Sequence, residues 1–172
     1  MSGVDGGALL ARPAVQRVAA SLKAGGAAAE IRALAETART AQDAANALGC
    51  PVGAIVKSLV FAVEGRPVMA LVAGDRQCDT KALGGVLQSR FDLSGKVGRA
   101  DADLVRAATG FTIGGVAPVA HAEAMPIVLD ASLRRFDTIW AAAGHPHCVF
   151  SSNVDELLRL SGAAESDTIG RA

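Results

Sequence analysis

The sequence predicts a single domain of the α+β or mixed α/β class. The chain has 172 residues, of which 51% are hydrophobic and 20% are charged. This is enough apolar material for one hydrophobic core. About seven β-like runs are interspersed with four or five helical segments along the chain. The connection at residues 64–66 is too short to hold a crossover helix, so part of the sheet must be antiparallel.

The first 35 residues are predicted to contain one helix and one strand. Residues 1–12 are rich in glycine and are expected to be flexible. Pro13 opens a helix, because its missing N–H costs nothing in a first turn, and Gly25-Gly26 end this helix. Residues 29–35 are expected to form a strand, since apolar and polar residues alternate there, although the alanines also favour a helix.

The central part of the chain predicts a β-hairpin. Residues 54–63 and 67–73 are β-like runs separated by a three-residue turn. Thr40 precedes them as the cap of a short helix, with its hydroxyl free to accept from backbone N–H groups. The remaining elements are helices at 80–89, 101–109 and 152–160 and strands at 96–100, 126–130, 138–143 and 148–151.

Composition and charge exclude several classes of protein. Seventeen basic and 17 acidic residues give a formal net charge of zero. This argues against a surface that follows a long nucleic acid, but it allows a local pocket for the end of one. Aromatic residues make up only 3%, so a surface that stacks several bases is not expected.

The cysteines and the N-terminus indicate a cytoplasmic protein. Cys50, Cys78 and Cys148 contain no CxxC pair, so neither a zinc site nor a disulfide framework is predicted. Free thiols fit a reducing compartment. The first residues lack the pattern of a signal peptide, and no apolar run approaches the roughly 20 residues that cross a bilayer.

Lys57 is the most unusual residue of the hairpin, because it interrupts the apolar run AIVKSLVFAV. On a strand it shares a face with Leu59 and Phe61, while Ser58 and Val60 lie on the other face. Both faces are apolar, so the ammonium needs a carboxylate, a water-filled cavity or an anionic ligand. Two interpretations remain open at this point: a lysine that extends to the surface, or a pocket lysine that meets substrate as a base, a nucleophile or an anion anchor.

A second feature is the glycine-rich segment TGFTIGGVAPVAH, residues 109–121. The adjacent Gly114 and Gly115 permit close approach of a ligand to the main chain, and their N–H groups can donate to an oxyanion or phosphate. Taken alone, the segment is also compatible with an ordinary turn.

Four segments in this order and spacing resemble the YbaK/ProX family: GCPVGAIVKSLVF (49–61), LVAGD (71–75), TGFTIGGVAPVAH (109–121) and WAAAGHPHCVF (140–150). These proteins are freestanding aminoacyl-tRNA deacylases related to the editing domain of bacterial prolyl-tRNA synthetases. The resemblance covers about residues 28–165 of what we expect to be one domain, 1–172. It implies a curved, mixed, largely antiparallel sheet flanked by short helices. It also implies hydrolysis of the ester that joins a wrong, small amino acid to a tRNA, with tRNA-Pro or a related tRNA as partner.

The resemblance also implies the site. In the family the matching lysine contacts the tRNA end, the glycine loop cradles the aminoacyl group, and in some relatives a His-Pro pair lines the amino-acid pocket. A hydroxyl of the terminal ribose helps to activate the water. Carried onto this sequence, the catalytic positions are Lys57 and Gly115, and the substrate-binding positions are Gly114, Val116, Ala117, Pro118 and His145. No metal and no cofactor are expected.

Other residues have simpler interpretations. Ser58 and Trp140 are expected to be structural, and capping is sufficient to explain Thr40. His121 and His147 are alternative proton acceptors, although the reaction does not require one. Two other functions remain open: a non-catalytic module that binds a tRNA end or nucleotide beside a synthetase, and a Schiff-base lysine acting on a small carbonyl compound. The chain is expected to be a monomer or a homodimer.

Overall fold

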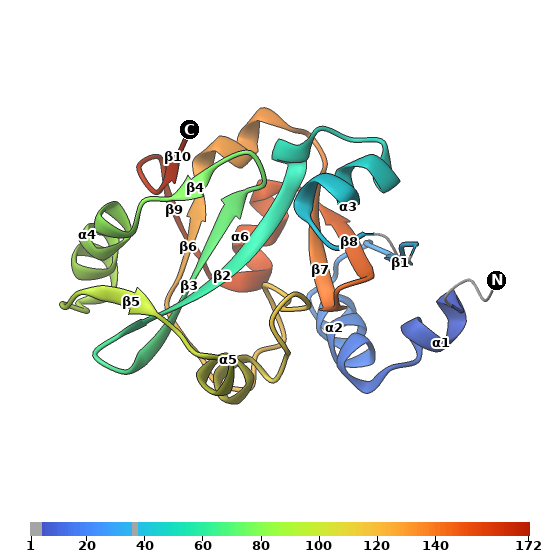
Figure 1. Cartoon of the computed structure of the whole chain (residues 1–172), viewed down its shortest axis with the longest axis horizontal. Coiled ribbons are helices and arrows are strands. Elements are labelled where there is room, and N and C mark those ends of the chain that lie inside the picture. The colour runs from blue at the N-terminus through green and yellow to red at the C-terminus, as the bar shows by residue number, and fades with distance from the viewer. Residues whose placement is uncertain (1–4, 36–37) are drawn as a thin grey trace.

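The computed structural model describes residues 5–35 and 38–172, and in these the chain forms a mixed sheet covered by helices (Figure 1). The sheet has the order β1-β8-β7-β2-β3-β6-β9, with β5 added to the edge of β2, and β4 and β10 form a separate pair. The strands are β1 (Ile31–Ala33), β2 (Ile55–Val63), β3 (Arg66–Ala73), β4 (Gln77–Cys78), β5 (Val97–Arg99), β6 (Ile127–Asp130), β7 (Ile139–His145), β8 (Cys148–Ser152), β9 (Ala164–Ser166) and β10 (Gly170–Arg171). Antiparallel and parallel pairs both occur, so the expected mixed α/β fold is confirmed.

Short helices cover both faces of the sheet. In Figure 1, α4 lies beside β5 at one end, and α1, α2 and α3 surround β7 and β8 at the other. The helices are α1 (Gly6–Leu10), α2 (Pro13–Ala24), α3 (Ala41–Leu48), α4 (Thr80–Phe91), α5 (Ala102–Thr109) and α6 (Val154–Ser161), with 3-10 turns η1 (Val52–Ala54) and η2 (Ala131–Arg135). Of the residues described, none belongs to a helix that is both long and apolar enough to cross a membrane.

The predicted hairpin is confirmed as the centre of the sheet. β2 and β3 pair in antiparallel register from Val56↔Ala73 to Val63↔Arg66. The turn residues Glu64 and Gly65 have φ of 51° and 75°. Two successive left-handed residues twist the chain in the sense that adjacent strands require, which favours this tight connection.

Alternation along β3 divides the core into two clusters. Met69 and Leu71 belong to the larger cluster, which contains residues of α2, α5 and α6. Val68 and Val72 point to the other face, against Leu83 and neighbouring residues of α4. Because β3 is covered on both faces, nearly all of its side chains are buried.

The other edge of β2 is divided between two strands. Ile55 and Val56 pair with β7 in parallel, and Phe61–Val63 pair with β5 in antiparallel. Residues 57–60 have no partner strand on this side in the part of the chain that is described. A gap therefore opens in the sheet beside Lys57.

Three details differ from the sequence analysis. Gly6–Leu10 were expected to be flexible but form α1, with Asp5 as its cap and Leu9 buried in the core. Residues 1–4, which were also expected to be flexible, lie outside the described residues. The last helix begins at Val154 rather than at residue 152, and its cap is Asn153, whose side chain accepts the hydrogen bond from Glu156 N. Strands β4, β9 and β10 were not predicted, because each holds only two or three residues and pairs with a distant segment.

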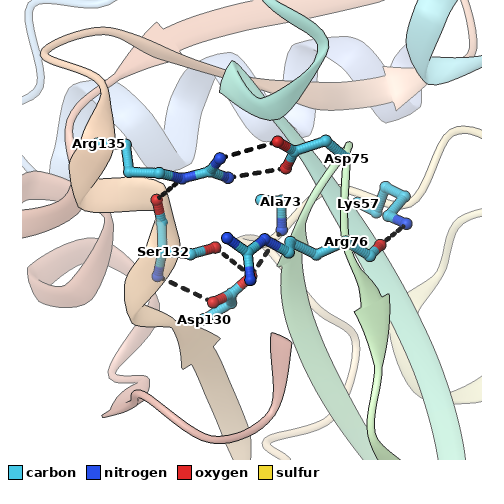
Figure 2. Close-up of polar contacts among 7 residues, drawn as sticks. All are labelled: Lys57, Ala73, Asp75, Arg76, Asp130, Ser132 and Arg135. Carbon is cyan, nitrogen blue, oxygen red and sulfur yellow. Dashed lines mark hydrogen bonds and ion pairs between the residues drawn. The ribbon is translucent and has the colours of Figure 1, made fainter. Parts of the chain in front are cut away.

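A buried carboxylate connects the end of β3 with the end of β6. Asp130 is 1% exposed, and its Oδ2 accepts from Ala73 N at 3.1 Å and from Ser132 Oγ at 2.8 Å, while Oδ1 accepts from Ser132 N at 2.9 Å (Figure 2). These contacts fix the point at which β3 leaves the sheet. The turn that follows carries the partner of Lys57.

Replacement of Asp130 by Asn should destabilise the protein without changing its shape. One side of the new amide must present N–H groups to an existing donor, so at least one hydrogen bond to a charged acceptor is lost. We expect the free energy of unfolding to fall by about 1.5–3 kcal/mol. Denaturant unfolding of Asp130→Asn should be compared with Asp137→Asn, in which the same change is made at an exposed residue. Equal stability of the two variants would contradict this role of Asp130.

Candidate functional site

A cavity of about 260 Å³ lies at the gap beside β2. Segments far apart in the sequence meet here: the start of α3, the first half of β2, the β7–β8 connection, and the glycine-rich segment 109–121, which we call the glycine loop. Among its lining residues are Thr40, Lys57, Gly114, Val116, Trp140 and Pro146. We call it the Lys57 cavity. It brings together three of the residues that the sequence analysis proposed for the site: Lys57, Gly114 and Val116.

The partner of Lys57 is a backbone carbonyl. Its Nζ donates to the carbonyl oxygen of Arg76, and the side chain is half-buried (Figure 2). An ammonium group has three donors, so a single carbonyl leaves two of them for a ligand or water. The sequence analysis expected a carboxylate, a cavity or an anion; the structure gives Lys57 a cavity and a neutral partner.

The turn that supplies this carbonyl is held from several sides. Gly74 N donates to Ile55 O at 2.7 Å, and Arg76 N donates to Ala73 O at 2.9 Å. Asp75 forms a two-pronged ion pair with Arg135, with N–O distances of 2.7 and 2.8 Å (Figure 2). The hydrogen bonds from Arg135 lower the pKa of the Asp75 carboxyl. The carbonyl of Arg76 is therefore fixed in place beside Lys57.

The glycine loop lies against the end of β7. A Cβ atom on Gly115 would lie 2.9 Å from His145 Cα and 3.0 Å from His145 N, so only glycine fits between these two backbones. Gly114 has φ of 94°, which other residues adopt at a cost. Gly115 N donates to Thr112 O at 3.1 Å. Among the described residues, the N–H groups of Gly114 and Val116 have no acceptor, and both residues line the Lys57 cavity; the same is true of Ile113.

Arg17 holds the two ends of the glycine loop, and the sequence analysis missed it. Its guanidinium lies 4.4 Å from the ring centre of Phe111, and it donates to Thr109 O and Ala120 O, both at 3.2 Å. Ala120 has φ of 62°, an unusual conformation at the loop's exit. Because Arg17 lies on α2, about 100 residues away in the sequence, no local pattern points to this contact.

Three further candidate residues, Ala117, Pro118 and His121, are not among the residues that line the Lys57 cavity. Ala117 and Pro118 are buried. Ala117 O lies 2.7 Å from His121 Nε2, and burial lowers the pKa of His121. His121 also meets the Phe111 ring edge-on. These contacts favour a supporting role for His121.

His145 lies on β7, where the sequence analysis expected a loop. A register shift between Ala142 and His145 bends the strand at its end. His145 Nδ1 accepts from His147 N at 3.1 Å. Burial, followed by the charges of Arg12 and His147, lowers the pKa of His145 and favours the neutral ring. The cavity wall here is Pro146, the next residue, rather than His145.

Thr40 and Trp140 have more than one role. Thr40 is the cap of α3, as expected, in a capping box with Asp43, and it also lines the Lys57 cavity. Trp140 is half-buried and lines the same cavity, with the guanidinium of Arg32 5.0 Å from its ring centre. For the residues described, no group of three or more His, Cys, Asp or Glu side chains is placed to hold a metal ion.

Comparison with known proteins matches residues 35–160 to the model of a family described as the aminoacyl-tRNA editing domain. The uncharacterized protein YwhH of Bacillus subtilis is 34% identical over 123 residues, which cover 71% of this chain and 74% of that protein. The proline–tRNA ligase of Desulfovibrio desulfuricans is 35% identical over 97 residues, 56% of this chain but only 16% of the ligase.

A solved structure agrees over almost the whole chain. The crystal structure of "a putative trans-editing enzyme for prolyl tRNA synthetase" has a TM-score of 0.82 and 36% sequence identity, and the match covers 94% of this chain and 99% of that one. Residues 35–160, which match the family model, contain Lys57, the glycine loop and the β7–β8 connection. The chain therefore belongs to the aminoacyl-tRNA editing domain family.

Proposed function

We propose that this protein is a trans-editing deacylase, which hydrolyses the ester between a small, wrongly attached amino acid and the 3′ end of tRNA-Pro or a related tRNA. The observation that carries the proposal is the Lys57 cavity, which is lined both by a lysine whose partner is neutral and by residues of the glycine loop whose N–H groups have no acceptor among the described residues. The family assignment and the structural neighbour support it.

The proposed reaction is attack of water on the ester carbonyl. It yields a free amino acid and a tRNA with its terminal ribose hydroxyl restored. Lys57 holds the anionic RNA end, and the N–H groups of Gly114 and Val116 donate to the carbonyl oxygen as it becomes negative. A hydroxyl of the terminal ribose helps to activate the water. This division leaves orientation and charge stabilisation to the protein.

The walls of the cavity favour a small amino acid. Ala142, Val116 and Pro146 contribute apolar surface without a charged group. In such a pocket one methylene changes binding by only about 1–3 kcal/mol, so exclusion of larger side chains is the stronger means of selection. The neutral form of His145, next to this wall, is consistent with an apolar pocket.

One observation favours a second candidate function. Over residues 5–35 and 38–172, the ionisable side chains that line the Lys57 cavity are Arg39 and Lys57, and neither is an obvious general base. The same cavity can therefore serve a non-catalytic module that binds a tRNA end. Turnover separates the two functions.

Replacement of Lys57 by Ala should abolish deacylation. The variant loses the ammonium that holds the RNA end, and we expect kcat/KM to fall by about 100-fold or more. The measurement is the release of amino acid from Ala-tRNA(Pro), Cys-tRNA(Pro) and Ser- or Thr-bearing tRNAs. Lys81→Ala removes an exposed lysine of α4 and is the matched control. Full activity of Lys57→Ala would refute the proposal, and absence of turnover by the wild type on every substrate would favour the binding module.

Replacement of Gly115 by Ala should reduce activity while the protein stays folded. The added Cβ meets the backbone of His145, so the loop must move away from β7 and its free N–H groups shift. We expect kcat to fall by about tenfold or more, because a displaced N–H donor stabilises the negative charge of the transition state only weakly. Gly85→Ala, on α4 with open space around it, is the control and should keep full activity. Unchanged kcat in Gly115→Ala would show that the position of the loop is not critical.

A further inference from the structure

A second cavity adjoins the Lys57 cavity along the unpaired edge of β2. It has a volume of about 300 Å³ and is lined by residues of β2, β5, α5 and the glycine loop. The two cavities share five lining residues: Ser58, Leu59, Ile113, Gly114 and Val116. We call the second one the Arg99 cavity, after the charged residue in its wall. The two cavities therefore lie next to each other, with Ile113 and Gly114 in the wall of both, and we call the pair the hollow.

The floor of this hollow offers unsatisfied hydrogen-bonding groups. An unpaired strand edge presents backbone N–H and C=O groups, and residues 57–60 of β2 have such an edge here. The hydroxyl of Ser58 is buried and has no hydrogen-bond partner among the described residues. A buried hydroxyl without a partner is costly, so a ligand or ordered water with polar groups fits this position better than an apolar one.

The shape of the gap selects a compact ligand over a peptide strand. Four residues of a strand span only about 13 Å. The gap is closed at one end by β7, which pairs from Val56 backwards, and at the other by β5, which pairs from Phe61 onwards. A peptide added as a further strand would run into both neighbours. A flat ring such as a nucleobase, with hydrogen-bond donors and acceptors along its edge, is short enough to fit between β7 and β5.

The charge of the hollow selects an anionic ligand. Among the residues that the structure describes, the ionisable ones that line the two cavities are Arg39, Lys57 and Arg99, and none of them is acidic. This is a local excess of positive charge in a chain whose formal net charge is zero. Ile113 stands at the junction and is 63% exposed, the one large hydrophobic side chain described as exposed in this structure. An apolar residue there can pack against the face of a base.

We infer that the Arg99 cavity binds the nucleotide that precedes the aminoacylated adenosine at the end of the tRNA. The edge of the base faces the free backbone of Ser58–Val60, the base packs against Ile113, and the phosphodiester lies at Arg99. Single-stranded RNA ends are recognised in this way, through splayed bases read at their edges. This inference rests on the proposed function, since it takes the Lys57 cavity as the place of the aminoacyl adenosine.

The test compares three esters of the same amino acid: on full tRNA, on the dinucleotide cytidylyl-adenosine, and on adenosine alone. Arg99→Gln should raise KM about tenfold for the first two, leave kcat unchanged, and have no effect on the adenosine ester, which lacks the phosphodiester. The slope of log KM against log salt should decrease by about 0.7 for the tRNA, as expected for one lost phosphate contact. Arg106→Gln changes an exposed arginine of α5 outside the cavities and should affect none of the three esters.

Two outcomes would overturn the inference: an equal loss on all three esters, which places Arg99 at the ester itself, and no loss on any of them. If the wild type hydrolyses none of the esters, the proposed function fails and the subsite is tested by binding. Titration of the intact chain with uncharged cytidylyl-adenosine and with adenosine, followed by NMR, then decides. Tighter binding of the dinucleotide that is lost in Arg99→Gln supports the subsite, and equal affinity for the two ligands rejects it.

Discussion

The site depends on how the ammonium group of Lys57 is satisfied inside an otherwise apolar strand. A carboxylate partner would neutralise the charge and compete with any anionic ligand. A backbone carbonyl solvates the ammonium but leaves its positive charge in place. The carbonyl must then be held where the lysine can reach it. The ion pair of Asp75 with Arg135 and the buried carboxylate of Asp130 fix the turn that carries it.

This arrangement requires an interruption of the sheet. If β7 and β5 met along β2, the edge beside Lys57 would be closed and no ligand could reach it. Instead each strand pairs with one end of β2, and the glycine loop lies over the gap between them. The loop is held by contacts on its two sides, from Arg17 on α2 and from the backbone of His145 on β7. The free N–H groups near Lys57 are thus placed by elements from both halves of the chain.

Local patterns in the sequence were sufficient for the parts of the fold that depend on neighbouring residues. The hairpin followed from two apolar runs and a short turn, and the cap Thr40 followed from its residue type and its place before a short helix. Lys57 stood out because a charge in an apolar strand is unusual. Asp75–Arg135 and Arg17 could not be found this way, since their partners lie about 60 to 100 residues apart. The free thiol Cys78, whose pKa burial raises to about 11, also reflects packing that only the fold reveals.

The distribution of charge limits what such a site can recognise. In the function that we propose, the three cationic side chains described along the hollow contact the RNA, in a chain whose formal net charge is zero. Three phosphate contacts to a single strand correspond to a salt dependence of only about two in log–log slope. The proposed site would therefore bind the end of an RNA and contribute few contacts to the rest of the molecule. Discrimination between tRNAs must then come from the last nucleotides and the amino acid, or from a second protein that holds the rest of the tRNA.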